Sequence, residues 1–176
     1  MSIRAALPED AAAIARVHVR SWQAAYRGLL PRAYLDALDV EERAAVWAER
    51  LGGVGAPGVF VATEEVSGPV VGFCCFRGRP GGGSDDLDPL ATGEIAALYA
   101  LPEVWGTGVG RRLLAASEEA LAADGFRDAA LWVLADNARG RRFYEAAGWR
   151  PDGTVTQDTT AGRTLDELRY RRRLFT

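Results

Sequence analysis

Three groups of residues in this sequence have types and spacings that could do chemistry. The first is a glycine-rich turn, residues 106–110, followed at once by Arg111 and Arg112. Backbone N–H groups in such a turn and in the first turn of a helix lack partners within the helix, and glycine lets a ligand approach closely. Because the positive end of the helix dipole lies there too, the turn could bind a phosphate or diphosphate. The alternative is a tight strand-to-helix connection with no ligand.

The other two groups contain a tyrosine with an asparagine, and a carboxylate. Asn137 and Tyr144 lie in the segment NARGRRFYEAAGW, residues 137–149. Asn137 could simply cap a helix, and Tyr144 could be a core tyrosine with a hydrogen-bonded hydroxyl. Glu94 begins the expected apolar strand 94–101 and could accept a proton as a general base. Its alternative is a strand-end carboxylate that faces solvent or pairs with an arginine.

Composition excludes several chemistries. All 21 basic residues are arginine, so a Schiff-base lysine and a Walker-type phosphate loop are ruled out. A single histidine, His18, and two adjacent cysteines, Cys74 and Cys75, argue against a zinc site, and we expect no metal. We expect His18 to be a packed histidine and the cysteines to be small buried hydrophobic residues. The dinucleotide fingerprint fails because Arg111 occupies the position of its third glycine.

Net charge and hydropathy limit the kinds of binding partner and the cellular location that we expect for the protein. A net charge of -3 argues against non-specific nucleic-acid binding. The basic run at residues 169–173 lies on an expected strand, and we interpret it as a solvated edge. No apolar stretch approaches the roughly 18–20 residues of a membrane helix, and the N-terminus has no signal pattern. We therefore expect a soluble, cytoplasmic protein that binds neither nucleic acid nor membrane.

The pattern of apolar residues predicts a mixed α/β (α+β) fold in a single domain, residues 1–176. The expected order is β-α-α-β-β-β-α-β-α-β-β. Strands are expected at 3–7, 59–62, 70–76, 94–101, 129–134, 149–155 and 165–174. Helical segments are expected at 8–27, 32–38, 40–51, 111–123 and 136–147. Residues 78–93 are rich in Gly, Pro and Asp, which predicts a surface loop or a functional lid.

Two of these segments resemble signatures of one known family. Residues 94–114, EIAALYALPEVWGTGVGRRLL, resemble the acetyl-CoA-binding motif of the GNAT (GCN5-related N-acetyltransferase) superfamily, which reads strand, Pro, Q/R-x-x-G-x-G/A, helix. Residues 137–149 are similar to its second signature, N-x-x-A-x-x-x-Y-x-x-x-G-F. The N-terminal strand and helices also fit the family's usual opening, so the resemblance covers nearly the whole chain. It implies a mostly antiparallel sheet of about seven strands, about four to five flanking helices, and a splayed strand pair that holds acetyl-CoA.

The resemblance assigns cofactor-binding roles residue by residue. It implies that Asn137 contacts the cofactor arm. The main chain on the splayed strand would bind the pantetheine arm, through Leu98, Tyr99 and Ala100. The turn and the residues after it would cradle the pyrophosphate, through Gly106, Thr107, Gly108, Val109, Gly110, Arg111 and Arg112. Trp105 departs from the family's Gln or Arg, which puts a side-chain contact there in doubt because indole is not a cation. Gly140 replaces a frequent alanine.

The resemblance also implies a direct transfer reaction. A primary amine would attack the thioester carbonyl, and strand N–H groups would stabilise the oxyanion. Tyr144 matches the tyrosine that faces the sulfur of coenzyme A and would act as general acid. Glu94 lies at the offset of a glutamate base in several family members. The acceptor side is expected to be lined by residues from the end of the first helix and the following loop, namely Trp22, Tyr26, Arg27 and Leu29.

Two other functions remain open at this point. A non-catalytic acyl-CoA-binding or sensor domain would share the fold and the cofactor site. A phosphate-binding interaction module outside the family would show no preference for acetyl-CoA over ATP. The sequence leaves the amine open, whether a small molecule or a peptide or protein amine, and a homodimer is one possible assembly because dimers are common in this fold.

Overall fold

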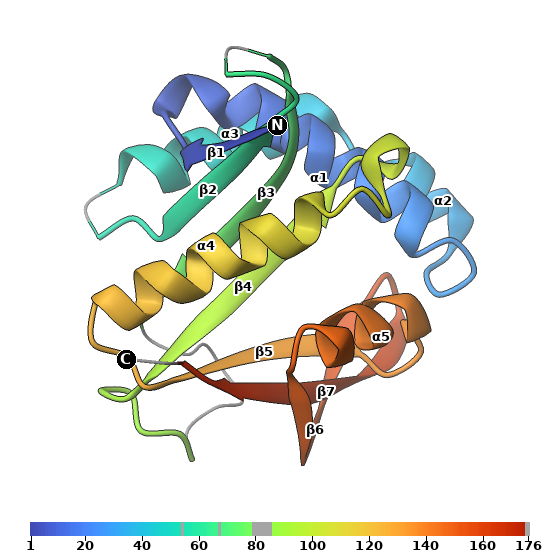
Figure 1. Ribbon diagram of the computed structural model, residues 1–176. Helices are drawn as coiled ribbons and strands as arrows, with labels where there is room; N and C mark the ends of the chain where they lie inside the picture. The colour runs from blue at the N-terminus through green and yellow to red at the C-terminus, as the bar shows by residue number, and fades with distance from the viewer. Residues whose placement is uncertain (54, 67, 79–85, 175–176) are drawn as a thin grey trace.

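The computed structural model describes residues 1–53, 55–66, 68–78 and 86–174. In this part of the chain a seven-stranded sheet has the order β1-β2-β3-β4-β5-β7-β6 (Figure 1). All neighbouring strands are antiparallel except β4 and β5, which are parallel. The strands are β1 (Ser2–Ala5), β2 (Gly58–Thr63), β3 (Val70–Arg77), β4 (Thr92–Ala100), β5 (Asp128–Leu134), β6 (Arg150–Thr160) and β7 (Arg163–Arg173).

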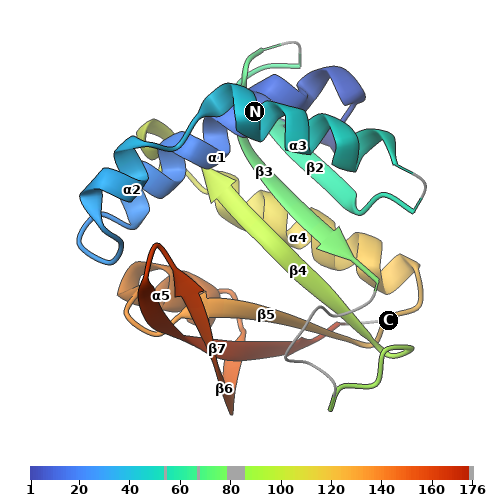
Figure 2. The same cartoon turned by 180° about the vertical axis from the view of Figure 1, so that it is seen from behind.

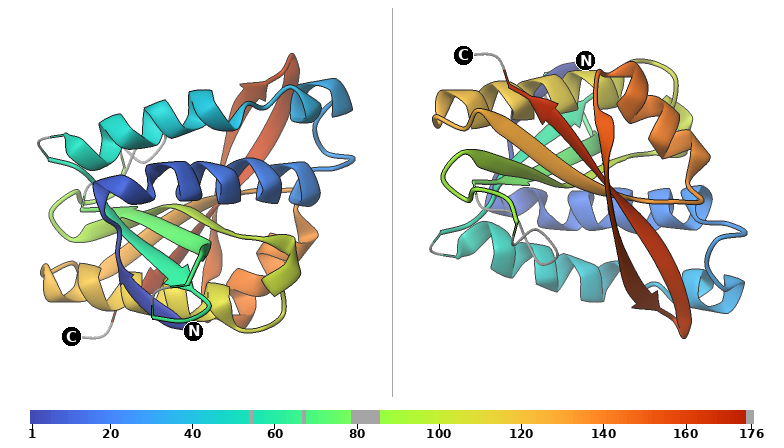
Figure 3. Two further views of the ribbon diagram at one scale, coloured as in Figure 1. Left: turned by 90° about the horizontal axis from the view of Figure 1, so that it is seen from above. Right: turned by 90° about the horizontal axis from the view of Figure 1, so that it is seen from below.

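Helices cover both faces of the sheet. α1 and α3 lie together on one face, and α4 packs on the other face against β2, β3 and β4 (Figures 2 and 3). In the chain α4 connects β4 to β5, since two parallel strands need a crossover connection. α5 lies on the same side as α4, beside β5 and β7. The helices are α1 (Ala11–Ala25), α2 (Arg32–Asp36), α3 (Val40–Gly52), α4 (Val109–Ala123) and α5 (Ala138–Ala146), with short 3-10 turns at Pro8–Asp10 and Pro102–Val104.

The mixed α/β fold predicted from the sequence is confirmed, and its elements follow the predicted order except that three helices, α1, α2 and α3, precede β2 where the predicted order has two. The sheet strand β3 is almost completely buried, because helices cover it on both faces. Cys74 and Cys75 are buried on opposite faces of this strand, as expected. The predicted apolar face of α4 is also buried, through Leu113, Leu114, Ser117 and Leu121.

Two boundaries differ from the prediction. α4 begins at Val109, two residues before the expected start, because Gly108 takes a left-handed φ of 88° and serves as its N-cap. The last two strands extend to Thr160 and from Arg163, so they form a longer hairpin than expected. Residues 79–85, the larger part of the predicted surface loop or lid, lie outside the described residues, and so does residue 67 in the β2–β3 connection.

The interpretation of residues 169–173 as a solvated edge is wrong. β7 lies between β5 and β6, so it is an internal strand of the sheet. Arg169 is only 3% exposed, and its guanidinium binds Asp86 through two hydrogen bonds of 2.6 and 2.7 Å and Asp152 through one of 2.6 Å. The charge is satisfied by carboxylates from two other segments, which is how an arginine becomes tolerable inside a fold.

None of the helices in the described ranges is long and apolar enough to cross a membrane.

His18 is a packed core histidine, as expected. Its ring is 8% exposed, stacks on Tyr99 at 5.2 Å between centroids, and accepts a hydrogen bond of 3.2 Å from the Trp47 indole to Nδ1. Burial, with a smaller effect from the charges of Arg43 and Arg50, lowers the pKa of His18 from 6.5 to about 3. The folded protein therefore holds His18 neutral.

This shift predicts a loss of stability in mild acid. Between pH 6.5 and about 3 the unfolded chain protonates His18 and the folded chain does not, so stability falls as the pH drops through that window. In His18→Gln this contribution is absent, and the difference in unfolding free energy between the two proteins should narrow by up to about 1.4 kcal/mol per pH unit. Denaturant titrations from pH 7.5 down to 4 measure it. A difference that stays constant over this range contradicts the prediction.

Candidate functional site

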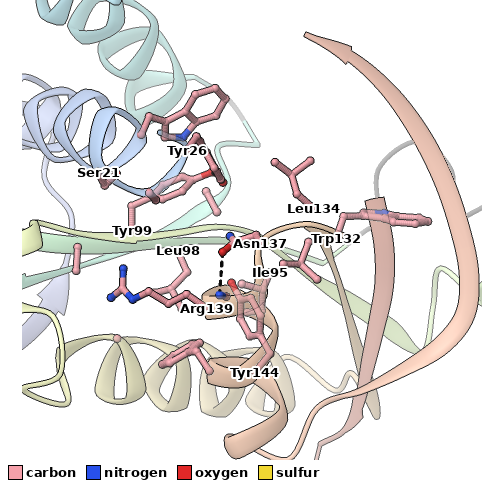
Figure 4. A pocket seen from close by; sticks show the side chains of 18 of the residues that line it. Ser21, Tyr26, Ile95, Leu98, Tyr99, Trp132, Leu134, Asn137, Arg139 and Tyr144 are labelled. Atoms are coloured by element: carbon pink, nitrogen blue, oxygen red, sulfur yellow. Dashed lines mark hydrogen bonds between the residues drawn. The ribbon is translucent and has the colours of Figure 1, made fainter. Parts of the chain in front are cut away.

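A large cavity lies where the two halves of the sheet separate. It has a volume of about 700 Å³, within the range of small-molecule sites. Figure 4 shows Tyr26 and Tyr99 on the α1 side of β4, and Arg139 and Tyr144 on the opposite side. Trp132 and Leu134 reach the cavity from β5. We call this cavity the cleft.

The cleft exists because β4 and β5 pair over only three residues. Their parallel register runs from Thr92 opposite Asp128 to Glu94 opposite Ala130 and then ends. β4 continues to pair with β3 up to Ala100, and this pairing contains an irregularity between Cys75 and Phe76, where β4 has one extra residue. Such bulges increase the twist of a strand and redirect its side chains. Beyond Glu94, the β4 edge that faces β5 therefore lines the cleft, which confirms the splayed strand pair.

The glycine turn forms one end of the cleft. Gly106 and Gly108 have φ values of 79° and 88°, in the left-handed region where a side chain is strained. The turn leads into the N-terminus of α4, whose N–H groups and dipole favour an anion. Gly106, Gly108, Val109 and Gly110 line the cleft, as do Leu98, Tyr99 and Ala100 on β4.

Three of the residues that were predicted to contact the pyrophosphate make other contacts or lie away from the cleft. Arg111 lines the cleft, but its guanidinium donates a hydrogen bond of 2.9 Å to the carbonyl oxygen of Ala146. The structure does not bring Thr107 or Arg112 to the cleft wall. The Thr107 hydroxyl instead donates to the Val104 carbonyl oxygen at 2.7 Å, which fixes the shape of the turn.

The Trp105 ring contacts an arginine of α5. Its indole N–H donates to the Ala100 carbonyl oxygen at 2.8 Å, which holds the ring at the end of β4. The Arg139 guanidinium lies over this ring, 3.4 Å from its centroid, and lines the cleft. Among the described residues Arg139 has no ion-pair partner, and desolvation lowers its pKa. The sequence motif did not identify Arg139, because stacking across two segments leaves no trace in either of them.

Asn137 both caps a helix and lines the cleft. Its side-chain oxygen accepts a hydrogen bond of 2.9 Å from the Gly140 N–H at the start of α5. A Cβ atom at position 140 would lie 2.7 Å from the Asn137 side-chain nitrogen. Glycine in place of the frequent alanine therefore leaves room for the Asn137 amide to fold over the helix end. The capping alternative is correct, and the amide nitrogen is the part of Asn137 that remains for a ligand.

Tyr144 extends from α5 into the cleft. Its ring packs edge-on against Phe143 and Trp149, with centroids 5.1 and 6.3 Å away. Burial raises the pKa of its hydroxyl well above the usual value, and the neighbouring Cys74 and Tyr99 add to this effect. The Tyr144 hydroxyl therefore keeps its proton and acts as a neutral hydrogen-bond donor.

Glu94 lies at the point where β4 and β5 separate. It is 5% exposed and lines the cleft, so the solvent-facing alternative is wrong. Its carboxylate accepts a hydrogen bond of 2.5 Å from the guanidinium Nε of Arg77 on β3. The arginine-pair alternative therefore holds, and the paired carboxylate still forms part of the cleft wall.

The wall on the α1 side contains half of the predicted acceptor residues. Trp22 and Tyr26 line the cleft, and the Tyr26 and Tyr99 hydroxyls are 3.5 Å apart. The structure does not bring Arg27 or Leu29 there, because the chain turns after α1 and Arg27 points to solvent.

Several residues that line the cleft were missed by the sequence analysis. They are Ser21, Leu30, Arg77, Trp132, Leu134, Arg139, Asp158 and Glu167. Those on β6 and β7 come from the last hairpin, whose alternating polar residues gave no sign of which face meets the cleft. Within the described residues, no three histidine, cysteine or acidic side chains gather as a metal site would require.

Comparison with known proteins shows one consistent relationship. The family model described as "Acetyltransferase (GNAT) family" matches residues 16–149 of this chain. The chain is 37% identical to the uncharacterized N-acetyltransferase YuaI of Bacillus subtilis over 146 residues, which cover 83% of this chain and 78% of YuaI.

Solved structures share the fold. A GCN5-related N-acetyltransferase from Rhodopseudomonas palustris superposes with a TM-score of 0.73 at 25% identity, and the match covers 98% of this chain and 95% of that one. The structure of yncA from Salmonella typhimurium with its cofactor acetyl-CoA matches with a TM-score of 0.70 at 24% identity, over 100% of this chain and 95% of that one.

Proposed function

The chain belongs to the GNAT acetyltransferase family, and on this premise we propose that it transfers an acetyl group from acetyl-CoA to a primary amine. The observation that carries the proposal is the separation of β4 from β5 beyond Glu94, which leaves a strand edge, a phenol and a carboxylate around one cleft. We further propose that residues 1–176 act as one catalytic domain, since the strands on both sides of the cleft, β4 and β5, belong to a single sheet.

The phosphate end of the cleft supports acetyl-CoA as donor. The glycine turn and the α4 N-terminus offer N–H groups and positive potential to a diphosphate. Arg139 adds a guanidinium held over Trp105, so a cation is supplied where the family often has Gln or Arg. The β4 edge from Leu98 to Ala100 would pair with the amides of the pantetheine arm as an added strand does. The solved relative with acetyl-CoA supports the same donor.

The chemistry follows from the groups around the splayed strand. The amine nitrogen attacks the thioester carbonyl carbon, and the new C–N bond leaves a negative charge on the carbonyl oxygen, which β4 N–H groups would stabilise. Glu94 accepts the proton of the amine, directly or through water. The oxyanion then collapses, the C–S bond breaks, and the sulfur leaves as a thiolate that takes the proton of Tyr144.

The surroundings of the sulfur make that last proton transfer reasonable. Burial raises the pKa of the Tyr144 hydroxyl well above its usual value. A thiolate formed beside it, away from water, is also a stronger base than it would be in water, because desolvation disfavours both anions. The raised pKa of Tyr144 therefore does not prevent it from protonating the departing sulfur.

Release of free thiol from acetyl-CoA with a panel of amines tests this function. Wild-type protein should consume acetyl-CoA only with an acceptor present, whereas a sensor domain would bind it without turnover. Tyr144→Phe should lower kcat by about a hundredfold or more, with acetyl-CoA affinity nearly unchanged. Calorimetry with coenzyme A provides the binding control. Full activity in Tyr144→Phe excludes the acid role.

Glu94→Gln tests the base. The variant should lose about a hundredfold in kcat/KM, with the affinity for acetyl-CoA nearly unchanged. Arg77→Gln is the control, because it breaks the same ion pair and leaves the carboxylate in place. If both variants lose activity equally, Glu94 serves only as the structural partner of Arg77.

Arg139→Ala tests the cation at the phosphate end. Loss of a guanidinium contact to phosphate should weaken acetyl-CoA binding by about tenfold or more. The substrate fragment S-acetylpantetheine lacks the diphosphate, so its KM should not change. The control variant Arg142→Ala removes an exposed charge from the same helix. Equal loss with both substrates would mean that Arg139 only supports the fold.

A further inference from the structure

The wall of the cleft carries charges of both signs. Arg111 and Arg139 line it beside the glycine turn, from α4 and α5. Asp158 and Glu167 line it from the β6–β7 hairpin, and we call this part of the wall the acidic end. The part beside the glycine turn suits the phosphates of the donor. The acidic end would repel an anion, so it fits an acceptor that carries positive charge.

Glu167 faces into the cleft because of its strand register. On β7 it lies directly opposite Leu134 of β5 and Thr156 of β6, and residues opposite one another in a sheet share a face. The carboxylate is partly buried, and burial, followed by the charge of Asp158, raises its pKa. In the described ranges no side chain donates a hydrogen bond to Glu167 or forms an ion pair with it. A buried charge of this kind is stabilised when a ligand supplies the partner.

Aromatic rings also line the cleft. Trp22 lines it from α1, Tyr26 from the residue after α1, and Trp132 from β5. Burial is the largest cause of the raised pKa of Tyr26, followed by Tyr99 and Tyr144, and the charge of Glu167 adds the smallest contribution. Aromatic faces attract ammonium groups, and they also exclude water from the contact with the carboxylate.

Resting on the proposed function, we propose that the acceptor is a diamine or oligoamine whose second ammonium group binds to Glu167. One amine of this substrate reacts at the thioester, and the other is held at the acidic end of the cleft. Glu94 is already paired with Arg77 beside the point of separation, so the two carboxylates have different tasks. Asp158 lines the cleft but is exposed to solvent, so it contributes only a long-range electrostatic attraction for a cationic acceptor.

A matched pair of acceptors tests the proposal. Butylamine and putrescine have the same reacting end, but only putrescine carries a second ammonium group. Wild-type protein should have the higher kcat/KM with putrescine. Glu167→Gln keeps the size of the side chain and should raise the KM for putrescine by about tenfold or more, with the KM for butylamine unchanged. Asp158→Asn should have a smaller effect, because salt and water screen its charge.

Asp166→Asn is the matched control. Asp166 neighbours Glu167 on β7, points to the opposite face and accepts a hydrogen bond from Gln157. The substitution therefore removes one negative charge, as Glu167→Gln does, but outside the cleft. It should leave both KM values unchanged. The proposal is overturned if the kcat/KM of wild-type protein for butylamine equals that for putrescine. It is also overturned if Asp166→Asn and Glu167→Gln change the KM for putrescine equally.

A binding experiment separates this proposal from the proposed function. Putrescine is titrated into wild-type and Glu167→Gln protein in the presence of coenzyme A, so no acetyl transfer takes place. Weaker binding to the variant supports the cation site even if no acceptor yields thiol, a result that would contradict only the acetyltransferase function. Conversely, transfer to monoamines with no difference in putrescine binding contradicts only the cation site.

Discussion

The short parallel ladder between β4 and β5 is the constraint on which the rest of the molecule depends. It covers three residue pairs, from Thr92 to Glu94 on β4, and beyond it the two halves of the sheet separate. A longer ladder would close the cleft and bury Glu94 between two paired strands. A ladder shorter than this would leave the β5-β7-β6 half attached only through α4 and its loops. The extra residue of β4 near Ala96 lies just beyond the ladder, where added twist moves the strand away from β5.

Aromatic side chains pack on both sides of the separation. In the first half, His18 of α1 and Trp47 of α3 form one aromatic cluster with Phe73 and Tyr99. In the second half, the rings of Tyr144 and Tyr170 pack together, and the Tyr170 hydroxyl donates a hydrogen bond of 2.7 Å to Glu145. One continuous hydrophobic core joins the two halves. Tyr99 and Tyr144 pack against this core and also line the cleft, so packing positions groups that face a ligand.

The sequence predicted the parts of this arrangement that depend on local pattern. The order of elements, the glycine turn and the apolar face of α4 follow from residue spacing within single segments. The sequence did not predict the environment of a residue where contacts between two distant segments determine it. In the sequence Arg169 is one of several arginines in a run that suggests a solvated surface, and only its contacts with Asp86 and Asp152 allow it to be buried. Glu167 is another polar residue in an alternating strand, and only the order β5-β7-β6 shows that its face meets the cleft.

The absence of lysine has a structural consequence that composition alone does not reveal. The guanidinium carbon of Arg139 lies over the Trp105 ring, 3.4 Å from its centroid, and Arg169 uses its planar fork to bind two carboxylates at once. A lysine ammonium is a compact, strongly hydrated charge that cannot stack or bind in this bidentate way. Both arginines therefore place a cation in a way that lysine could not, one beside the glycine turn and one between Asp86 and Asp152. Because Asp86 and Asp152 occupy the guanidinium of Arg169, this arginine does not pair with Glu167, two positions away on β7.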